Sequence, residues 1–405
     1  MRVEPTQTKN KAVDYGVLLV LIGLFLAPIF VREMILSKFY QINYFAVLGC
    51  AFILFRGGGK IKKKNLPLYI LMFLMLGILI ISEMHAGRTV QGFFRVFAGL
   101  LIPLTLLSYR PINPEETIKV VINALKAVSI FILVTCVIDF FADKQIILAY
   151  YKLAHDDNYY NMAFTSNRMF SYVGHPLYNA EIFLMTFGLN YAYNEIFLKN
   201  HKNDKWIILI TLFGIVFTAS KSAIAIFLGL LVVLYIKNWK YMIFCLSILI
   251  FGYFNGLFDL VMERFNGSLT TGRNEVWSRI KNSGIQFFHF FWGNGSDSKY
   301  SYSYLEEWAR AAFEYPYRLF ALEFGILFSG LLLYTIFIIP AYKIIKNKSN
   351  RLLLLIIFAA ISLHVNIYNG IGTYSDAMYL FCLFVFVILN MSILGRKVEN
   401  IRDEK

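Results

Sequence analysis

Residues 66–82, LPLYILMFLMLGILIIS, contain no charged side chain. An α-helix needs about 20 largely apolar residues to cross the hydrocarbon core of a bilayer, so this stretch predicts a membrane span. The whole chain is 58% hydrophobic and only 16% charged, whereas about a quarter of a soluble domain is charged. No polar block is long enough for a soluble domain, so residues 1–405 are predicted to form a single integral membrane domain.

Apolar runs of this kind recur along the sequence. They predict an all-α, polytopic transmembrane bundle of about twelve spans, because only helices or closed barrels satisfy their backbone groups in lipid. Several runs are shorter than a usual span, which favours tilted or broken helices there. The predicted spans are 14–31, 41–55, 66–82, 90–108, 118–141, 176–198, 206–219, 221–236, 240–258, 317–342, 352–369 and 374–394.

The basic residues that give the net charge of +14 lie mainly in the connections between these runs. Basic residues are enriched in every second connection, for example Lys60–Lys64 and Lys343–Arg351, and they are sparse in the others. Basic loops stay on the cytoplasmic side, so both termini are predicted to be cytoplasmic. Charges scattered over short loops do not form a nucleic-acid-binding face.

Two outer connections, 142–175 and 259–316, are too long to be simple turns. Loops longer than about 15 residues are usually functional or disordered, and these two are rich in aromatic residues, which argues against disorder. In the second loop, 275–281 and 286–292 predict amphipathic helix on the outer membrane surface.

Cationic residues mark these outer segments. Arg168 lies in SNRMFSYVGHP, Arg273 and Arg279 lie in or just after TGRNEVW, and Lys221 lies in TASKSA at a short outer turn. A guanidinium group matches phosphate oxygens, so these residues are candidates to bind a diphosphate. The alternatives are snorkelling toward the membrane surface and pairing with nearby carboxylates.

The stretch EYPYRLFALEFGI, residues 314–326, brings ionisable groups into the outer end of a predicted span. Glu314 is the preferred candidate for a general base. Arg318 and Glu323 are weaker substrate-binding candidates, and a structural pair between them is the alternative, because an ionisable group in lipid is costly unless it is paired or functional.

Five further polar residues have weaker assignments. Arg95 enters the fourth span and is a candidate for the outer cavity, and His175, before Pro176, is either a weak binding candidate or a helix cap. Glu33, Glu83 and Asp376 are expected to be solvated loop charges. No metalloprotease, nucleotide-binding or nucleophile-elbow motif is present, so neither a metal nor a cofactor is predicted.

The order of these motifs resembles the O-antigen ligase and polymerase superfamily, and most closely the Wzy-type polysaccharide polymerases. The shared pieces are an arginine-bearing stretch ending in Gly-His-Pro, a Ser-Lys-Ser-Ala turn, Thr-Gly-Arg-x-x-x-Trp leading to Trp-Gly-Asn-Gly, and a final Glu-Phe-Gly-Ile. The resemblance implies a multi-pass protein of the bacterial plasma membrane with its active site facing the periplasm or exterior. It implies a metal-independent glycosyltransferase that joins undecaprenyl-diphosphate-linked repeat units into polysaccharide, with a chain-length regulator and a flippase as possible partners.

The resemblance also bears on individual positions. Arg168 and Arg273 match the family's outer-loop arginines, and Arg273 begins an Arg-x10-Gly pattern that ends at Gly284. Where the ligases carry a His-Asn pair, this chain has Glu314 and Tyr315, which favours a polymerase over a ligase. A ligase acting on the same donor and a lipid-linked oligosaccharide flippase or other transporter remain the alternatives.

Overall fold

The computed structural model describes residues 14–36, 39–56, 63–201, 204–236, 239–254, 273–282, 287–298, 312–347, 350–372 and 376–403. Within these ranges the chain is helical and contains no β-strand, only an isolated bridge between Ser171 and Gly174. The prediction of an all-α protein is confirmed.

Each of the twelve predicted ranges overlaps at least one helix. The described helices are α1 (Tyr15–Phe25), α2 (Ile29–Ile35), α3 (Tyr44–Arg56), η1 (Lys63–Asn65), α4 (Leu66–His85), α5 (Val90–Val96), η2 (Phe97–Leu101), η3 (Ile102–Ser108), α6 (Pro114–Phe141), α7 (Gln145–Leu153), α8 (Asp157–Thr165), α9 (Pro176–Tyr193), η4 (Asn194–Leu198), α10 (Asp204–Thr218), α11 (Lys221–Tyr235), α12 (Trp239–Phe254), α14 (Arg273–Asn282), α16 (Pro316–Phe324), α17 (Ile326–Leu333), η6 (Tyr334–Ile338), α18 (Ile339–Asn347), α19 (Arg351–Ile367) and α20 (Ala377–Asp403).

Among the described residues, five continuous helical stretches are long and apolar enough to cross a membrane. They are 66–85, 90–108, 114–141, 326–347 and 377–395, and the bent pair α1–α2 adds a sixth, with 79° between its two parts. Helices α3, α11, α12 and α19 are apolar but shorter. The chain is therefore built as a membrane protein.

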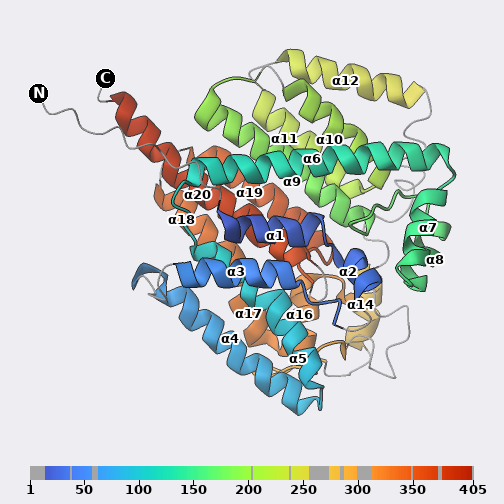
Figure 1. Cartoon of the computed structure of the whole chain (residues 1–405), viewed down its shortest axis with the longest axis vertical. Helices are drawn as coiled ribbons and strands as arrows, with labels where there is room; N and C mark the ends of the chain where they lie inside the picture. Colours follow the sequence, from blue (N-terminus) through green and yellow to red (C-terminus); the bar gives the residue numbers. More distant parts are fainter. Residues whose placement is uncertain are drawn as a thin grey trace, which may run out of the picture.

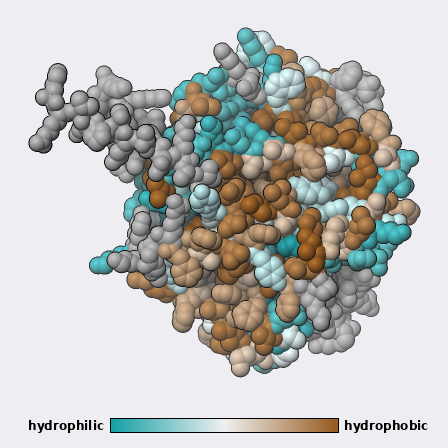
Figure 2. All heavy atoms as spheres, in the orientation of Figure 1, coloured by the Kyte–Doolittle hydropathy of each residue, from teal (hydrophilic) through white to brown (hydrophobic). Residues whose placement is uncertain are grey.

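The long helices run side by side across the molecule. In Figure 1, α1, α3 and α6 cross the view roughly parallel to one another, while α2, α7, α8 and α14 gather at the right. The far end of α20 lies at the opposite edge. Apolar residues cover the middle of this face and hydrophilic ones gather toward its edges (Figure 2). Side chains as exposed as Phe55 at 77% and Phe73 at 74% suit contact with lipid.

Two predicted elements are corrected by the structure. The predicted span 317–342 is broken at Gly325, which separates α16 from α17. Residues 275–281 do form a helix, α14, but 287–292 are not helical. The reason is that the latter segment pairs with another part of the chain: the amides of Ile326 and Leu327 donate to the carbonyls of His289 and Phe290.

A buried ion pair closes the break between α1 and α2. The guanidinium of Arg32 donates to both carboxylate oxygens of Asp376 at 3.1 Å and to the carbonyl of Ala27 at 2.7 Å. Asn43 bridges the carbonyl of Gly23 and the Asp376 carboxylate at 3.0 and 2.8 Å. Arg32 and Asp376 are 3% and 5% exposed, so the expectation that Asp376 is a solvated loop charge is wrong.

Asp376→Ala tests this pair. The substitution leaves the Arg32 guanidinium buried without its counter-ion, which should cost about 3–5 kcal/mol of stability. Thermal unfolding of the purified protein in detergent measures the effect. Asp143→Asn, which removes an exposed charge between α6 and α7 and keeps a residue that tolerates the φ of +48° there, is the control. Equal unfolding temperatures for the two variants would contradict the role given to Asp376.

A second polar cluster ties the end of η4 to α10 and α11. His201 lies between two carboxylates, with Nδ1 2.6 Å from Asp204 and Nε2 2.8 Å from Glu195. Asp204 also accepts hydrogen bonds from Asn194 and Tyr235, both at 2.6 Å. Burial lowers the pKa of His201, but the hydrogen bonds and charges of Glu195 and Asp204 outweigh it, so the pKa is raised.

This cluster makes stability pH-dependent. A histidine whose pKa is higher in the folded than in the unfolded chain stabilises the fold below its unfolded pKa of about 6.5, and the contribution is lost as pH rises through the folded value. The wild-type unfolding temperature should therefore fall toward that of His201→Gln as pH increases from about 6.5. A difference between the two proteins that stays constant with pH would rule out this linkage.

Candidate functional site

Two of the motifs singled out in the sequence interlock. The backbone amides of Asn294 and Gly295 donate to the carbonyls of Leu322 and Glu323, at 3.0 and 2.9 Å. A Cβ on Gly293 would lie 2.2 Å from the Glu323 carbonyl, and Gly325 has a φ of +95°. The contact is thus between backbones, and it requires glycine at both positions. Trp-Gly-Asn-Gly and Glu-Phe-Gly-Ile form one structural unit.

The C-terminal end of α4 is part of the same unit. Ser82 accepts a hydrogen bond from the Gly293 amide at 2.9 Å, and Glu83 accepts from the Ser296 amide and hydroxyl at 2.6 and 3.0 Å. Glu83 is 3% exposed, so the expectation that it is solvated is wrong as well. Its carboxylate satisfies the amide and the hydroxyl of Ser296, which are buried away from water.

Glu323 and Arg318 have different partners. Glu323 is fully buried and accepts a hydrogen bond from the Asp297 amide at 3.1 Å. The guanidinium of Arg318 lies over the ring of Trp277 at 4.4 Å and over that of Tyr315 at 4.8 Å. The first contact fastens α14 to α16 by a cation–π interaction. Arg318 and Glu323 thus have separate partners and do not form the Arg–Glu pair that was the structural alternative to a binding role.

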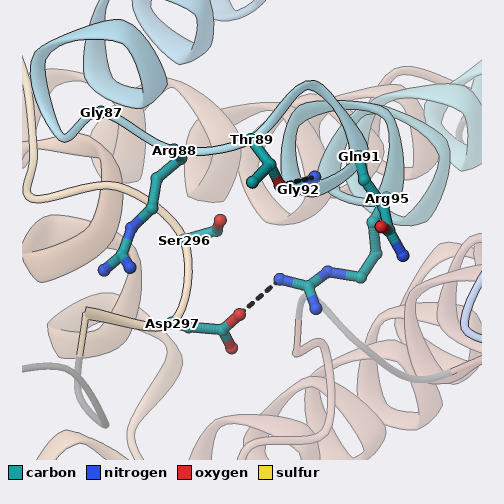
Figure 3. Close-up of a pocket in the computed structure, with 8 residues that line it drawn as sticks. All are labelled: Gly87, Arg88, Thr89, Gln91, Gly92, Arg95, Ser296 and Asp297. Carbon is teal, nitrogen blue, oxygen red and sulfur yellow. Dashed lines mark hydrogen bonds and ion pairs between the residues drawn. The ribbon is translucent and has the colours of Figure 1, made fainter.

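A polar pocket opens beside the interlocked segments. Its volume is about 370 Å³. Arg88 and Arg95 both line it, and Figure 3 shows the Arg95 guanidinium directed at the Asp297 carboxylate, whereas the Arg88 side chain lies on the other side of Ser296. Arg95 forms an ion pair with Asp297 at 2.5 Å and donates to Gln41 at 2.7 Å. The remaining lining residues are Gly87, Thr89, Gln91, Gly92 and Ser296.

Arg95 is the pocket residue that was a candidate from the sequence. Arg88, Ser296 and Asp297 were missed, because nothing in their local sequence distinguishes them from ordinary loop residues. The sequence gives only an indirect signal for them. Ser296 and Asp297 directly follow the Trp-Gly-Asn-Gly motif, so the position of that motif determines theirs.

Arg168 and Lys221 come together at a second basic position. The Nε of Arg168 donates to the carbonyl of Thr218 at 2.9 Å, near the end of α10. Ala219, with a φ of +48°, turns the chain, and Ser220 caps α11, which starts with Lys221. Lys221 therefore lies at the positive end of the α11 dipole, and the Arg168 guanidinium is held at the carbonyl end of α10, three residues before it.

The remaining candidates lie elsewhere. His175 caps α9, since its Nδ1 accepts from the Leu177 amide at 3.2 Å. Glu314 is half-buried in the turn before α16. Arg279 is exposed on α14, and Arg273 begins that helix, although its side chain and Gly284 lie outside the described residues. Over the described ranges, no three His, Cys, Asp or Glu side chains converge as metal ligands do.

Gly293→Ala tests the interlock. The added methyl group meets backbone atoms that cannot move aside, so the substitution should cost about 1–3 kcal/mol and lower the unfolding temperature. Gly330→Ala, in α17, is the control, because a Cβ there meets nothing within 4 Å. If Gly293→Ala unfolds like Gly330→Ala, the packing of the two motifs is not tight.

Comparison with known proteins does not assign the chain to a family. No protein-family model matches the chain. No curated protein matches it in sequence. The functional argument therefore depends on the arrangement of the residues themselves.

Proposed function

We propose that the chain is a polysaccharide polymerase of the outer face of the bacterial plasma membrane. In this proposal it has about twelve spans and two cytoplasmic termini, as the distribution of basic residues indicates. It transfers a growing glycan from undecaprenyl diphosphate to the next lipid-linked repeat unit. A flippase would supply that unit, and a chain-length regulator would limit the product.

The basic position at the start of α11 is the observation that carries this proposal. A lysine at the N-terminus of a helix is unfavourably placed in the helix dipole, and a nearby arginine adds to the positive potential. Lys221 and Arg168 have this arrangement, with Arg168 held on Thr218. A bound anion would relieve both effects, and backbone amides at a helix start are suited to phosphate.

The chemistry follows from where charge develops. An acceptor sugar hydroxyl attacks the anomeric carbon of the donor glycan, the bond from that carbon to the diphosphate oxygen breaks, and undecaprenyl diphosphate leaves. Arg168, Lys221, Arg273 and Arg279 would stabilise the leaving group's negative charge. Glu314 would accept the hydroxyl proton as general base.

Arg168→Ala and Glu314→Gln test the mechanism in cells. Loss of one preorganised cationic donor typically lowers a rate by about 10²–10³-fold, so Arg168→Ala should abolish long polysaccharide, and Glu314→Gln should do the same by removing the base. Gel profiles of the polysaccharide and immunoblots of the membrane fraction measure product and protein. Arg351→Ala, which removes an exposed arginine at the start of α19, should leave the profile unchanged.

The same gels separate the alternatives. A missing polymerase leaves single repeat units attached to their final acceptor, whereas a missing ligase leaves finished polymer on its lipid carrier. A missing flippase leaves lipid-linked repeat units on the cytoplasmic side. Normal chain lengths in both variants would end the proposed mechanism.

A further inference from the structure

The pocket between Arg88 and Arg95 has the properties of a ligand site that is already occupied by part of the chain. Its volume of about 370 Å³ lies in the range of about 300–1,000 Å³ that is common for small-molecule sites. Two arginines line it, and the Asp297 carboxylate is paired with one of them, Arg95 (Figure 3). A carboxylate offers guanidinium the same planar pair of oxygens that a phosphate does.

The backbone of Asp297 is fixed, while its carboxylate remains accessible. Its amide donates to Glu323, and the neighbouring Ser296 is held by Glu83 through both its amide and its hydroxyl. The Asp297 side chain is 36% exposed, compared with 15% for Arg95. The carboxylate is thus the more exposed partner, so it can leave without unfolding the segment when an incoming anion replaces it on the less exposed Arg95 guanidinium.

We propose that this pocket binds a phosphate or diphosphate group, and that Asp297 is its resting occupant. The incoming anion takes the place of the carboxylate on Arg95 and is also held by Arg88. In choosing an isoprenyl diphosphate as the ligand to test, the inference rests on the proposed function. It assigns to Arg88, Arg95 and Asp297 a binding role separate from that of Arg168 and Lys221.

The charge of the pocket supports an exchange of this kind. With Asp297 in place, its carboxylate neutralises the Arg95 guanidinium, and Arg88 is a second cation lining the pocket. When the carboxylate leaves, two positive charges face a diphosphate diester, which carries two negative charges. Glu83 and Glu323 lie behind the segment, where their oxygens accept hydrogen bonds from Ser296 and Asp297, so they hold the loop.

Asp297→Asn separates this arrangement from an ordinary structural ion pair. The variant removes the competing charge and keeps a residue that tolerates the φ of +61° at this position. Farnesyl diphosphate should bind to the full-length protein in detergent about tenfold more tightly in Asp297→Asn than in wild type, as for the loss of one close charge–charge repulsion. Arg95→Gln should weaken the same binding by a similar factor. Isothermal titration calorimetry measures both.

Asp143→Asn is the matched control. It makes the same charge change in another outer segment, at an aspartate with a φ of +48°, and should leave the affinity within about twofold of wild type. Tighter binding in Asp297→Asn cannot result from misfolding. Unchanged or weaker binding in Asp297→Asn, or unchanged binding in Arg95→Gln, would overturn the proposal.

Two further probes identify the source of the phosphate. If inorganic pyrophosphate shows the same dependence on Asp297, the pocket binds the phosphate group of a free or lipid-linked substrate. If only nanodiscs containing phosphatidylglycerol show it, the phosphate belongs to a bilayer lipid. Both outcomes support the site. Because the readout is affinity, failure here leaves the polymer assay on Arg168 and Glu314 unaffected, and the reverse also holds.

Discussion

The structure depends on one constraint: in a hydrocarbon environment every backbone amide and carbonyl must find a partner within the protein. A continuous helix meets this requirement internally, but a broken helix does not. Such breaks lie in the described part of the chain at Leu26–Pro28, between α1 and α2, and at Gly325, between α16 and α17. Each break is closed by side chains or backbone from a distant part of the sequence.

The partners at these breaks are polar, and this explains why charged residues lie deep in an apolar protein. Arg32 and Asn43 hold the carbonyls of Ala27 and Gly23, and Asp376 neutralises Arg32. At the second break the segment 289–295 pairs with 322–327. Removing any one partner would leave a buried polar group without a hydrogen bond, which is more costly than never having buried it.

The candidate sites lie where these hydrogen bonds fix segments at the ends of the helices. Fastening Trp292–Gly295 to Glu323–Gly325 fixes the position of the next residues, Ser296 and Asp297, and thereby forms the pocket facing Arg88 and Arg95. In the same way, Arg168 is fixed by the exposed carbonyl end of α10 beside Lys221. Structural hydrogen bonds therefore set the spacing of the cations that a diphosphate would require.

Local properties of the sequence predicted the helices well. The apolar runs predicted the membrane-length helices, but not α7 and α8, which lie in the predicted outer connection 142–175. The same reasoning failed for Glu83 and Asp376. Local sequence predicts that a carboxylate at the edge of an apolar run is exposed to water. Whether it is buried depends on a partner that lies elsewhere in the chain.

The sequence by itself determined that this is an all-α protein of the membrane, because hydrophobicity over about 20 residues is a local property that needs no partner. It also marked the motifs with glycine and arginine between the apolar runs. The tertiary structure alone decided which polar and charged side chains pair with one another. Arg32 and Asp376 are 344 positions apart, Ser82 and Gly293 are 211 apart, and Arg95 and Asp297 are 202 apart. Such pairs are selected by three-dimensional packing and by the need to neutralise charge away from water, and neither is visible in a local stretch of sequence.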